Sequence, residues 1–131
     1  MASSSLDDLQ TLPIASLEPS TGVPPDRCLK AEVVLLWPYS SSTRRAAILV
    51  SEPDFRLRRR KGQIRVQLHG PAAQALAETH ISIGDLVHIG LNGARWADQA
   101  DRGSAVSAPG RAVDGELVFE REIHLEVRHK S

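Results

Sequence analysis

Residues 63–79 read QIRVQLHGPAAQALAET and contain the two patterns that decide the fold. In the first seven residues every second side chain is apolar, and the side chains between them are Arg65, Gln67 and His69. A strand with this alternation turns an apolar face inward and a basic, polar face outward. Gly-Pro then interrupts the pattern, and residues 72–79 are rich in helix formers. The stretch predicts a half-buried strand followed by a short helix.

Four further segments read as strands, because they are apolar or alternating and are bounded by turn residues. They are residues 29–37, 45–51, 86–91 and 116–128. The predicted order is strand, strand, strand, helix, strand, strand, which indicates an all-β fold, a β-barrel with one short helix. The polar, Gly- and Pro-bearing residues 97–115 predict a long loop.

Composition bounds the class of protein. The chain has 131 residues, 41% of them hydrophobic and 24% charged, which is typical of one globular domain. We expect residues 1–28 to form an N-terminal arm, whose apolar piece 12–17 docks on a domain of residues 29–131.

The single cysteine, Cys28, excludes an intrachain disulfide and suits a reducing compartment. No apolar run approaches the roughly 18 residues of a membrane span, and a signal peptide's apolar region is missing. We therefore expect a soluble intracellular protein without a membrane partner. Separately, because the sequence ends at HKS directly after a predicted strand, we expect it to be part of a longer chain.

The net charge of zero hides a strong asymmetry. Residues 44–65 carry eight basic residues against two acids, whereas the remainder carries eight against fourteen. A concentrated positive region on an otherwise acidic chain predicts a defined footprint for a polyanion.

The order of elements matches an OB-fold, a five-stranded, partly open Greek-key barrel whose helix lies between strands 3 and 4. OB-folds bind oligonucleotides across strands 2 and 3 and between the first and last loops. Those loops would be residues 38–44 and 97–115, and the arginine-rich stretch joins the second and third strands. The basic and aromatic residues between positions 37 and 65 therefore fall on the expected ligand face.

Five motifs carry a resemblance to a known family. They are LPIASL (12–17), AEVVLLWPY (31–39), AILVSEPD (47–54), QIRVQLHG (63–70) and IGDLVHI (83–89). Their order over residues 12–92 resembles the telomeric single-stranded DNA-binding OB-folds of the protection-of-telomeres type. The resemblance implies binding of G-rich single-stranded DNA, a place in the nucleus at chromosome ends, other telomere proteins as partners, and no catalysis. The chain departs from that family in its more basic RLRRRK run and in loop 97–115, which carries no familiar motif.

Aromatic residues at the expected ligand face are candidates for base stacking, which contributes about 1–3 kcal/mol per base. Trp37 and Tyr39 flank Pro38 where the first strand enters its loop, and Tyr39 is the better placed. Trp37 fits a plug at the end of the barrel core equally well. Phe55 fits either a loop anchor or a base contact, and Trp96 lies at the rim beside the last loop.

Basic residues supply the expected phosphate contacts, since guanidinium groups pair well with phosphate oxygens. In an extended segment, Arg56, Arg58 and Arg60 lie on one side. RLRRRK also fits a nuclear localisation signal, and the two roles are compatible. The candidate nucleic-acid-binding residues are Trp37, Tyr39, Arg44, Phe55, Arg56, Arg58, Arg60, Lys61, Arg65, His69 and Trp96.

No pattern in the sequence indicates an enzyme. No two of the five histidines stand four apart around a glutamate, and Cys28 has no neighbouring histidine or cysteine in the sequence. We therefore expect no cofactor, no metal and no small-molecule substrate. Two alternatives remain: an OB-fold that binds single-stranded RNA, and a protein-interaction module that docks through its acidic surface or residues 12–17.

Overall fold

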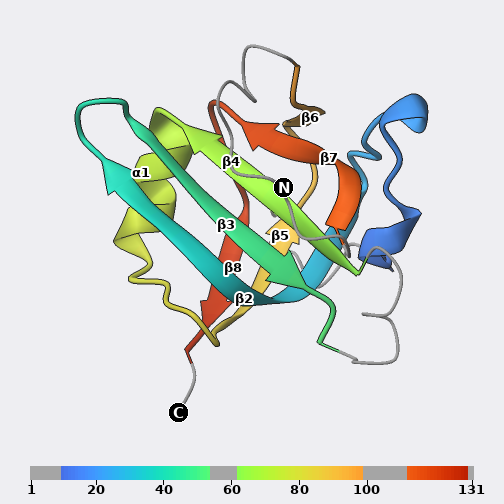
Figure 1. Ribbon diagram of the computed structural model, residues 1–131, viewed down its shortest axis with the longest axis horizontal. Helices are drawn as coiled ribbons and strands as arrows, with labels where there is room; N and C mark the ends of the chain where they lie inside the picture. The colour runs from blue at the N-terminus through green and yellow to red at the C-terminus, as the bar shows by residue number, and fades with distance from the viewer. Residues whose placement is uncertain (1–9, 54–61, 99–111, 130–131) are drawn as a thin grey trace, which may run out of the picture.

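A computed structural model describes residues 10–53, 62–98 and 112–129 of the chain. Within these ranges the chain forms one mixed sheet of eight strands, one α-helix and two short 3-10 helices (Figure 1). The strands are β1 (Gln10–Thr11), β2 (Arg27–Ser40), β3 (Arg45–Ser51), β4 (Gln63–His69), β5 (Leu86–Gly90), β6 (Ala94–Trp96), β7 (Ala112–Phe119) and β8 (Leu125–Arg128). The helices are η2 (Ile14–Ser16), η3 (Pro19–Thr21) and α1 (Pro71–Glu78).

The sheet runs in the order β6–β7–β4–β3–β2–β5–β8, and β1 pairs in parallel with the start of β2. β4 and β7 are parallel, and the other neighbours are antiparallel. Residues 91–93 alone separate β5 from β6, although these two strands lie near opposite ends of the order. The sheet must therefore curl until its ends come close. In Figure 1, β2, β3 and β4 run side by side, and β5 and β8 lie behind them.

The core fills the concave side of this curl. Strands contribute side chains such as Leu29, Ile48, Val66, Ile89 and Phe119, each at most 1% exposed. Burying a side chain of this size contributes about 1.5–3 kcal/mol. The expectation that the apolar members of residues 63–69 face the core is confirmed. The strand is not half-buried as expected, because Gln67 on its other face is also buried and Arg65 and His69 are only partly exposed.

Helix α1 closes one end of the core with Ala72, Ala73 and Leu76. Pro71 occupies its first turn, where the missing N–H costs nothing. Gly70 precedes it with a φ of 57°, a left-handed conformation that favours glycine. No helix among the described residues is long and apolar enough to cross a membrane.

The apolar piece of the N-terminal arm is part of the core. Ile14 is fully buried, and Leu12 and Leu17 are nearly so. The Ile14 N–H donates to Oε1 of Glu52 at 2.6 Å, which gives a buried carboxylate a partner. The expectation that residues 12–17 dock on the domain is confirmed.

Most expected elements are present, but the expected number of strands was wrong. An all-β fold with one helix after the third predicted strand is confirmed, and β3 and β4 have the predicted bounds. However, the described residues form a sheet of eight strands and not five. The segment 116–128 divides into β7 and β8 because the chain changes partners there: β7 pairs with β4 and β6, whereas β8 pairs with β5. The predicted loop 97–115 is also too long, since β7 begins at Ala112.

Candidate functional site

The face of β2, β3 and β4 that points away from the core carries the candidate site; we call it the outer face. The strand register places Trp37 of β2 opposite Ala47 of β3, and Ala47 opposite Gln67 of β4. The next row holds Leu49 and Arg65, and Arg65 is opposite Glu116 of β7. These side chains therefore share one face, as the period of two requires.

Trp37 and Arg65 meet across β3. The guanidinium carbon of Arg65 lies 4.5 Å from the centroid of the Trp37 ring, which is a cation–π contact. The small side chain of Ala47 stands between the two strands in the register and leaves room for this approach. The guanidinium lies over the indole, and the two side chains form a cation–π pair on the outer face.

Glu116 holds the Arg65 side chain in this position. Arg65 Nη1 donates to Glu116 Oε1 at 2.9 Å, and Gln67 Nε2 donates to the same oxygen at 2.8 Å. Gln67 Oε1 in turn lies 3.1 Å from His69 Nε2. Both side chains of the ion pair are largely buried, at 14% and 12% exposed, so water screens their attraction less than at an open surface. The residues Trp37, Arg65, Gln67, His69 and Glu116 form one connected group, which we call the outer-face network.

A register shift in β2 separates the two aromatics of its WPY motif. Trp37 pairs with Ala47 and Ser40 pairs with Arg45, so β2 has one residue more than β3 in this interval. Such a bulge changes the face to which the next side chain points. Tyr39 packs against the core, whereas Trp37 stands outside it with Arg65. Tyr39, which the sequence favours for base stacking, therefore lies on the core side, and Trp37 lies on the outer face.

Exposed arginines border the outer-face network at the β2–β3 turn. Arg44 and Arg45 are both exposed, and Arg45 lies opposite His69. Arg44 has a φ of 56°, its N–H donates to the Ser40 carbonyl at 2.7 Å, and its carbonyl accepts from Gly70 N–H at 2.8 Å. The backbone fixes the turn while both guanidinium groups remain in solvent.

The remaining candidates divide into two groups. Trp96 of β6 is opposite the core residue Leu117 and packs against the core, and its buried Nε1 has no hydrogen-bond partner among the described residues. Five candidates lie outside the described residues, so their predicted roles stay predictions. They are Phe55, Arg56, Arg58, Arg60 and Lys61.

Three polar atoms on the outer face are buried without a partner in the described part of the chain. They are Ser51 Oγ, Gln63 Oε1 and Arg65 Nε. Ser51 and Gln63 are opposite each other, and Arg65 follows on the same face of β4. Buried polar atoms are normally hydrogen-bonded, so these atoms mark a part of this face with unused bonding capacity.

Sequence reasoning missed a contact on the other half of the sheet. Cys28 Sγ of β2 lies 2.9 Å from His88 Nε2 of β5, and His88 Nδ1 lies 4.0 Å from Glu126 Oε2 of β8. The residues are far apart in the chain, and only the register, which places Lys30 opposite His88, could have indicated the contact. Cys28 is fully buried, so the contact ties β2 to β5. The described residues contain no group of three His, Cys, Asp or Glu side chains that could hold a metal ion.

Comparison with known proteins gives a family. A family model described as a domain of unknown function (DUF8502) matches residues 7–131. No curated protein and no solved structure matches the chain.

Proposed function

The chain belongs to the family described as a domain of unknown function (DUF8502), and we propose that it binds single-stranded nucleic acid across the outer face of β2, β3 and β4. The ligand that fits the sequence resemblance is G-rich telomeric DNA. The corresponding place of action is the end of the chromosome in the nucleus, alongside other telomere proteins. The proposal requires neither a cofactor nor a reaction.

The arrangement of strands supports an OB-fold as the scaffold. In this interpretation the fourth barrel strand is β5 continued by β6, and the fifth is β7 continued by β8. β5 pairs with β2 and β6 pairs with β7, so the fourth strand joins both ends of the sheet. The parallel pairing of β4 with β7 and the position of α1 after β4 fit the same scheme. Oligonucleotides bind OB-folds on the face that carries Trp37 and Arg65 here.

The cation–π pair of Trp37 and Arg65 is the observation that carries the proposal. A flat ring outside the core, only partly exposed and held by an arginine, is a platform on which an unpaired base can stack. Glu116 fixes the guanidinium before any ligand arrives, so little side-chain entropy remains to be lost on binding. Bases in a duplex are already stacked on each other, so this platform selects single strands.

Charge supports the same ligand class. The basic residues between positions 44 and 65 give this region a charge of +6 against −6 for the remainder. Arg44 and Arg45 are exposed beside the outer-face network and available to phosphates. Phosphate contacts supply affinity and position, whereas base contacts supply selectivity.

A set of four binding titrations tests the proposal. The protein is titrated at fixed salt with four labelled ligands of equal length: G-rich telomeric single-stranded DNA, its complementary strand, the matching RNA and the duplex. We expect the G-rich DNA strand to bind most tightly. Tighter RNA binding would identify an RNA-binding protein, because only the 2′-hydroxyl and the thymine methyl distinguish the strands. No binding of any of the four would overturn the proposal and leave a protein-interaction module.

A further inference from the structure

Strand β8 lies at one end of the sheet, and within the described ranges of the chain one of its two edges is open. Its Leu125–Arg128 backbone pairs with β5, and no other strand among the described residues pairs with its opposite edge. An unpaired edge offers N–H and C=O groups to another strand.

The hydrogen bonds of β5 show which β8 groups point outward. Gly90 N–H donates to the His124 carbonyl at 2.9 Å, so this pair shares ladder hydrogen bonds. In an antiparallel ladder, hydrogen-bonded pairs alternate with non-hydrogen-bonded pairs. Glu126 and Arg128 therefore direct their backbone groups to β5, whereas Leu125 and Val127 direct theirs to the open edge.

We propose that this edge binds the same edge of a second copy of the chain, antiparallel, around a two-fold axis at Val127. In this register Val127 faces Val127 of the second copy as a hydrogen-bonded pair. Glu126 then faces Arg128 of the second copy, and Arg128 faces Glu126 of the second copy. Both are non-hydrogen-bonded pairs, in which the Cα atoms are about 4.5 Å apart and the side chains are closest. The open edge of β8 is thus complementary in charge to the same edge of a second copy.

The neighbouring registers lack this complementarity. Moving the axis to Glu126 brings two glutamates face to face, and moving it to Arg128 brings two arginines together. Like charges directly opposite in a sheet are destabilising. Charge therefore selects the register centred on Val127.

The surroundings of β8 suit an added strand. Its inward-facing side chains Leu125 and Val127 pack against the core but stay partly exposed, whereas Val87 and Ile89 of β5 are buried. The Glu126 side chain is 60% exposed, and its contact with His88 is long at 4.0 Å. A second copy would cover the border of the core and give both charges close partners.

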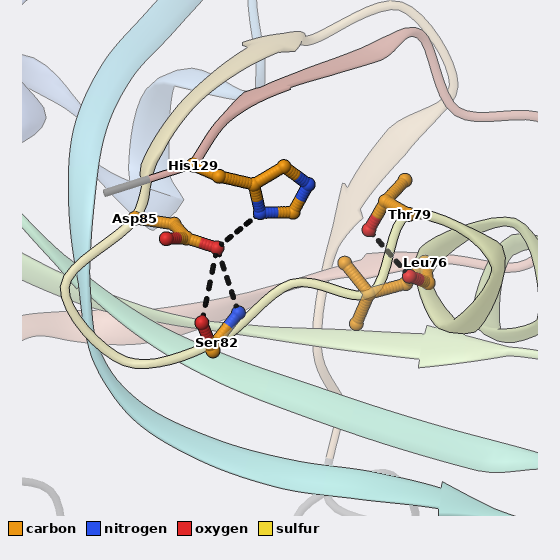
Figure 2. Close-up of polar contacts among 5 residues, drawn as sticks. All are labelled: Leu76, Thr79, Ser82, Asp85 and His129. Carbon is orange, nitrogen blue, oxygen red and sulfur yellow. Dashed lines mark hydrogen bonds and ion pairs between the residues drawn. The ribbon is translucent and has the colours of Figure 1, made fainter. Parts of the chain in front are cut away.

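The C-terminal end of β8 is already fixed. Figure 2 shows His129 and Ser82 pointing at the carboxylate of Asp85, which is 1% exposed. Asp85 Oδ2 lies 2.9 Å from His129 Nδ1 and accepts from Ser82 N–H at 2.9 Å and from Ser82 Oγ at 3.2 Å. Because the residue after β8 is anchored to the turn before β5, the edge is held in place for pairing.

Sedimentation velocity of the full chain tests the proposal, from about 10 μM to about 1 mM in low salt. We expect a reversible monomer–dimer equilibrium. Glu126→Arg and Arg128→Glu, each alone, put like charges at two symmetric contacts and should weaken dimerisation at least about tenfold. The double exchange Glu126→Arg with Arg128→Glu restores complementarity and should restore the dimer.

An equimolar mixture of the two single variants provides the most specific test of the proposed register. Each variant repels itself, but the two are complementary to each other in the same register, so a heterodimer should form. Circular dichroism of every variant should match the parent, because both side chains are exposed. A parent that stays monomeric at the highest concentration, or single variants that dimerise as the parent does, would overturn the proposal.

Discussion

The Arg65 guanidinium and the Trp37 ring lie 4.5 Å apart over β3, and Glu116 anchors the arginine from the other side at 2.9 Å. Trp37 is thereby held outside the core, on the face that we propose binds nucleic acid. Tyr39, two residues later, packs against the core. The two aromatics of one motif therefore have different surroundings, so substitutions can test them separately.

Replacement of each aromatic separates binding from folding. Trp37→Ala should weaken binding of G-rich single-stranded DNA by about 1–3 kcal/mol, the range for one stacked base, with a melting temperature close to that of the parent. Tyr39→Ala should lower the melting temperature and leave the affinity of the folded molecules nearly unchanged. Fluorescence anisotropy and thermal unfolding measure the two effects. The reverse pattern would place Tyr39 at the ligand and remove Trp37 from it.

The two arginines Arg65 and Arg44 should differ in their contribution to salt dependence. Arg65 is already paired with Glu116. Arg65→Ala should therefore weaken binding because Trp37 loses its cation–π partner, and it should leave the slope of log affinity against log salt concentration nearly unchanged. Arg44 is exposed, and Arg44→Ala should flatten the slope by about 0.7, the value for one phosphate contact on a single strand. Equal slope changes in both variants would show that Arg65 leaves Glu116 to bind phosphate.

Glu116→Gln provides the converse test. It removes the negative charge and retains an oxygen that accepts from Arg65. The Arg65 guanidinium charge is then uncompensated, so we expect the slope of log affinity against log salt concentration to become steeper by up to about 0.7. A slope equal to the parent's would mean that the ion pair does not withhold Arg65 from phosphates.

The arginine run between β3 and β4 lies outside the described residues, and its test rests on charge alone. If Arg56, Arg58 and Arg60 each neutralise a phosphate, their joint replacement by Ala should flatten the slope by roughly 2 units. Selectivity for G-rich DNA over a scrambled strand should persist. A triple variant with the parental slope that fails to accumulate in nuclei would assign the run to localisation alone.

The N-terminal arm contributes to stability. Ile14 is fully buried, so Ile14→Ala should lower the free energy of unfolding by about 2–5 kcal/mol. The neighbouring Ser16 is exposed, and Ser16→Ala serves as the matched control, expected within about 0.5 kcal/mol of the parent. Denaturant titration compares the three proteins. A parental value for Ile14→Ala would show that the arm is not part of the core.

The sequence predicted what depends on local pattern. Strand β4 alternates strictly and β3 is a short apolar run between turn residues, so their bounds were recovered. The break between β7 and β8 was missed because Leu117, Phe119, Ile123 and Leu125 keep one parity across it. At this point the pairing partner changes, and the side-chain pattern does not record it.

Site geometry was predictable only where it follows from alternation. Arg65, Gln67 and His69 share the outer face as expected, but the bulge near Pro38 moved Tyr39 to the core side. The contact between Cys28 and His88 depends on a strand register, which long-range pairing determines. No local pattern contains that information.

One titration tests the central claim that Trp37 stacks on an unpaired base. Trp96→Phe leaves Trp37 as the single tryptophan and removes an indole nitrogen that bonds to no described residue. The Trp37 fluorescence of this variant is followed during addition of G-rich single-stranded DNA and, in a separate titration, of the same sequence as duplex. Stacking on Trp37 predicts strong quenching by the single strand, with an affinity at least tenfold above that of the duplex. Equal affinities and unchanged fluorescence would contradict the claim and leave charge alone to account for binding.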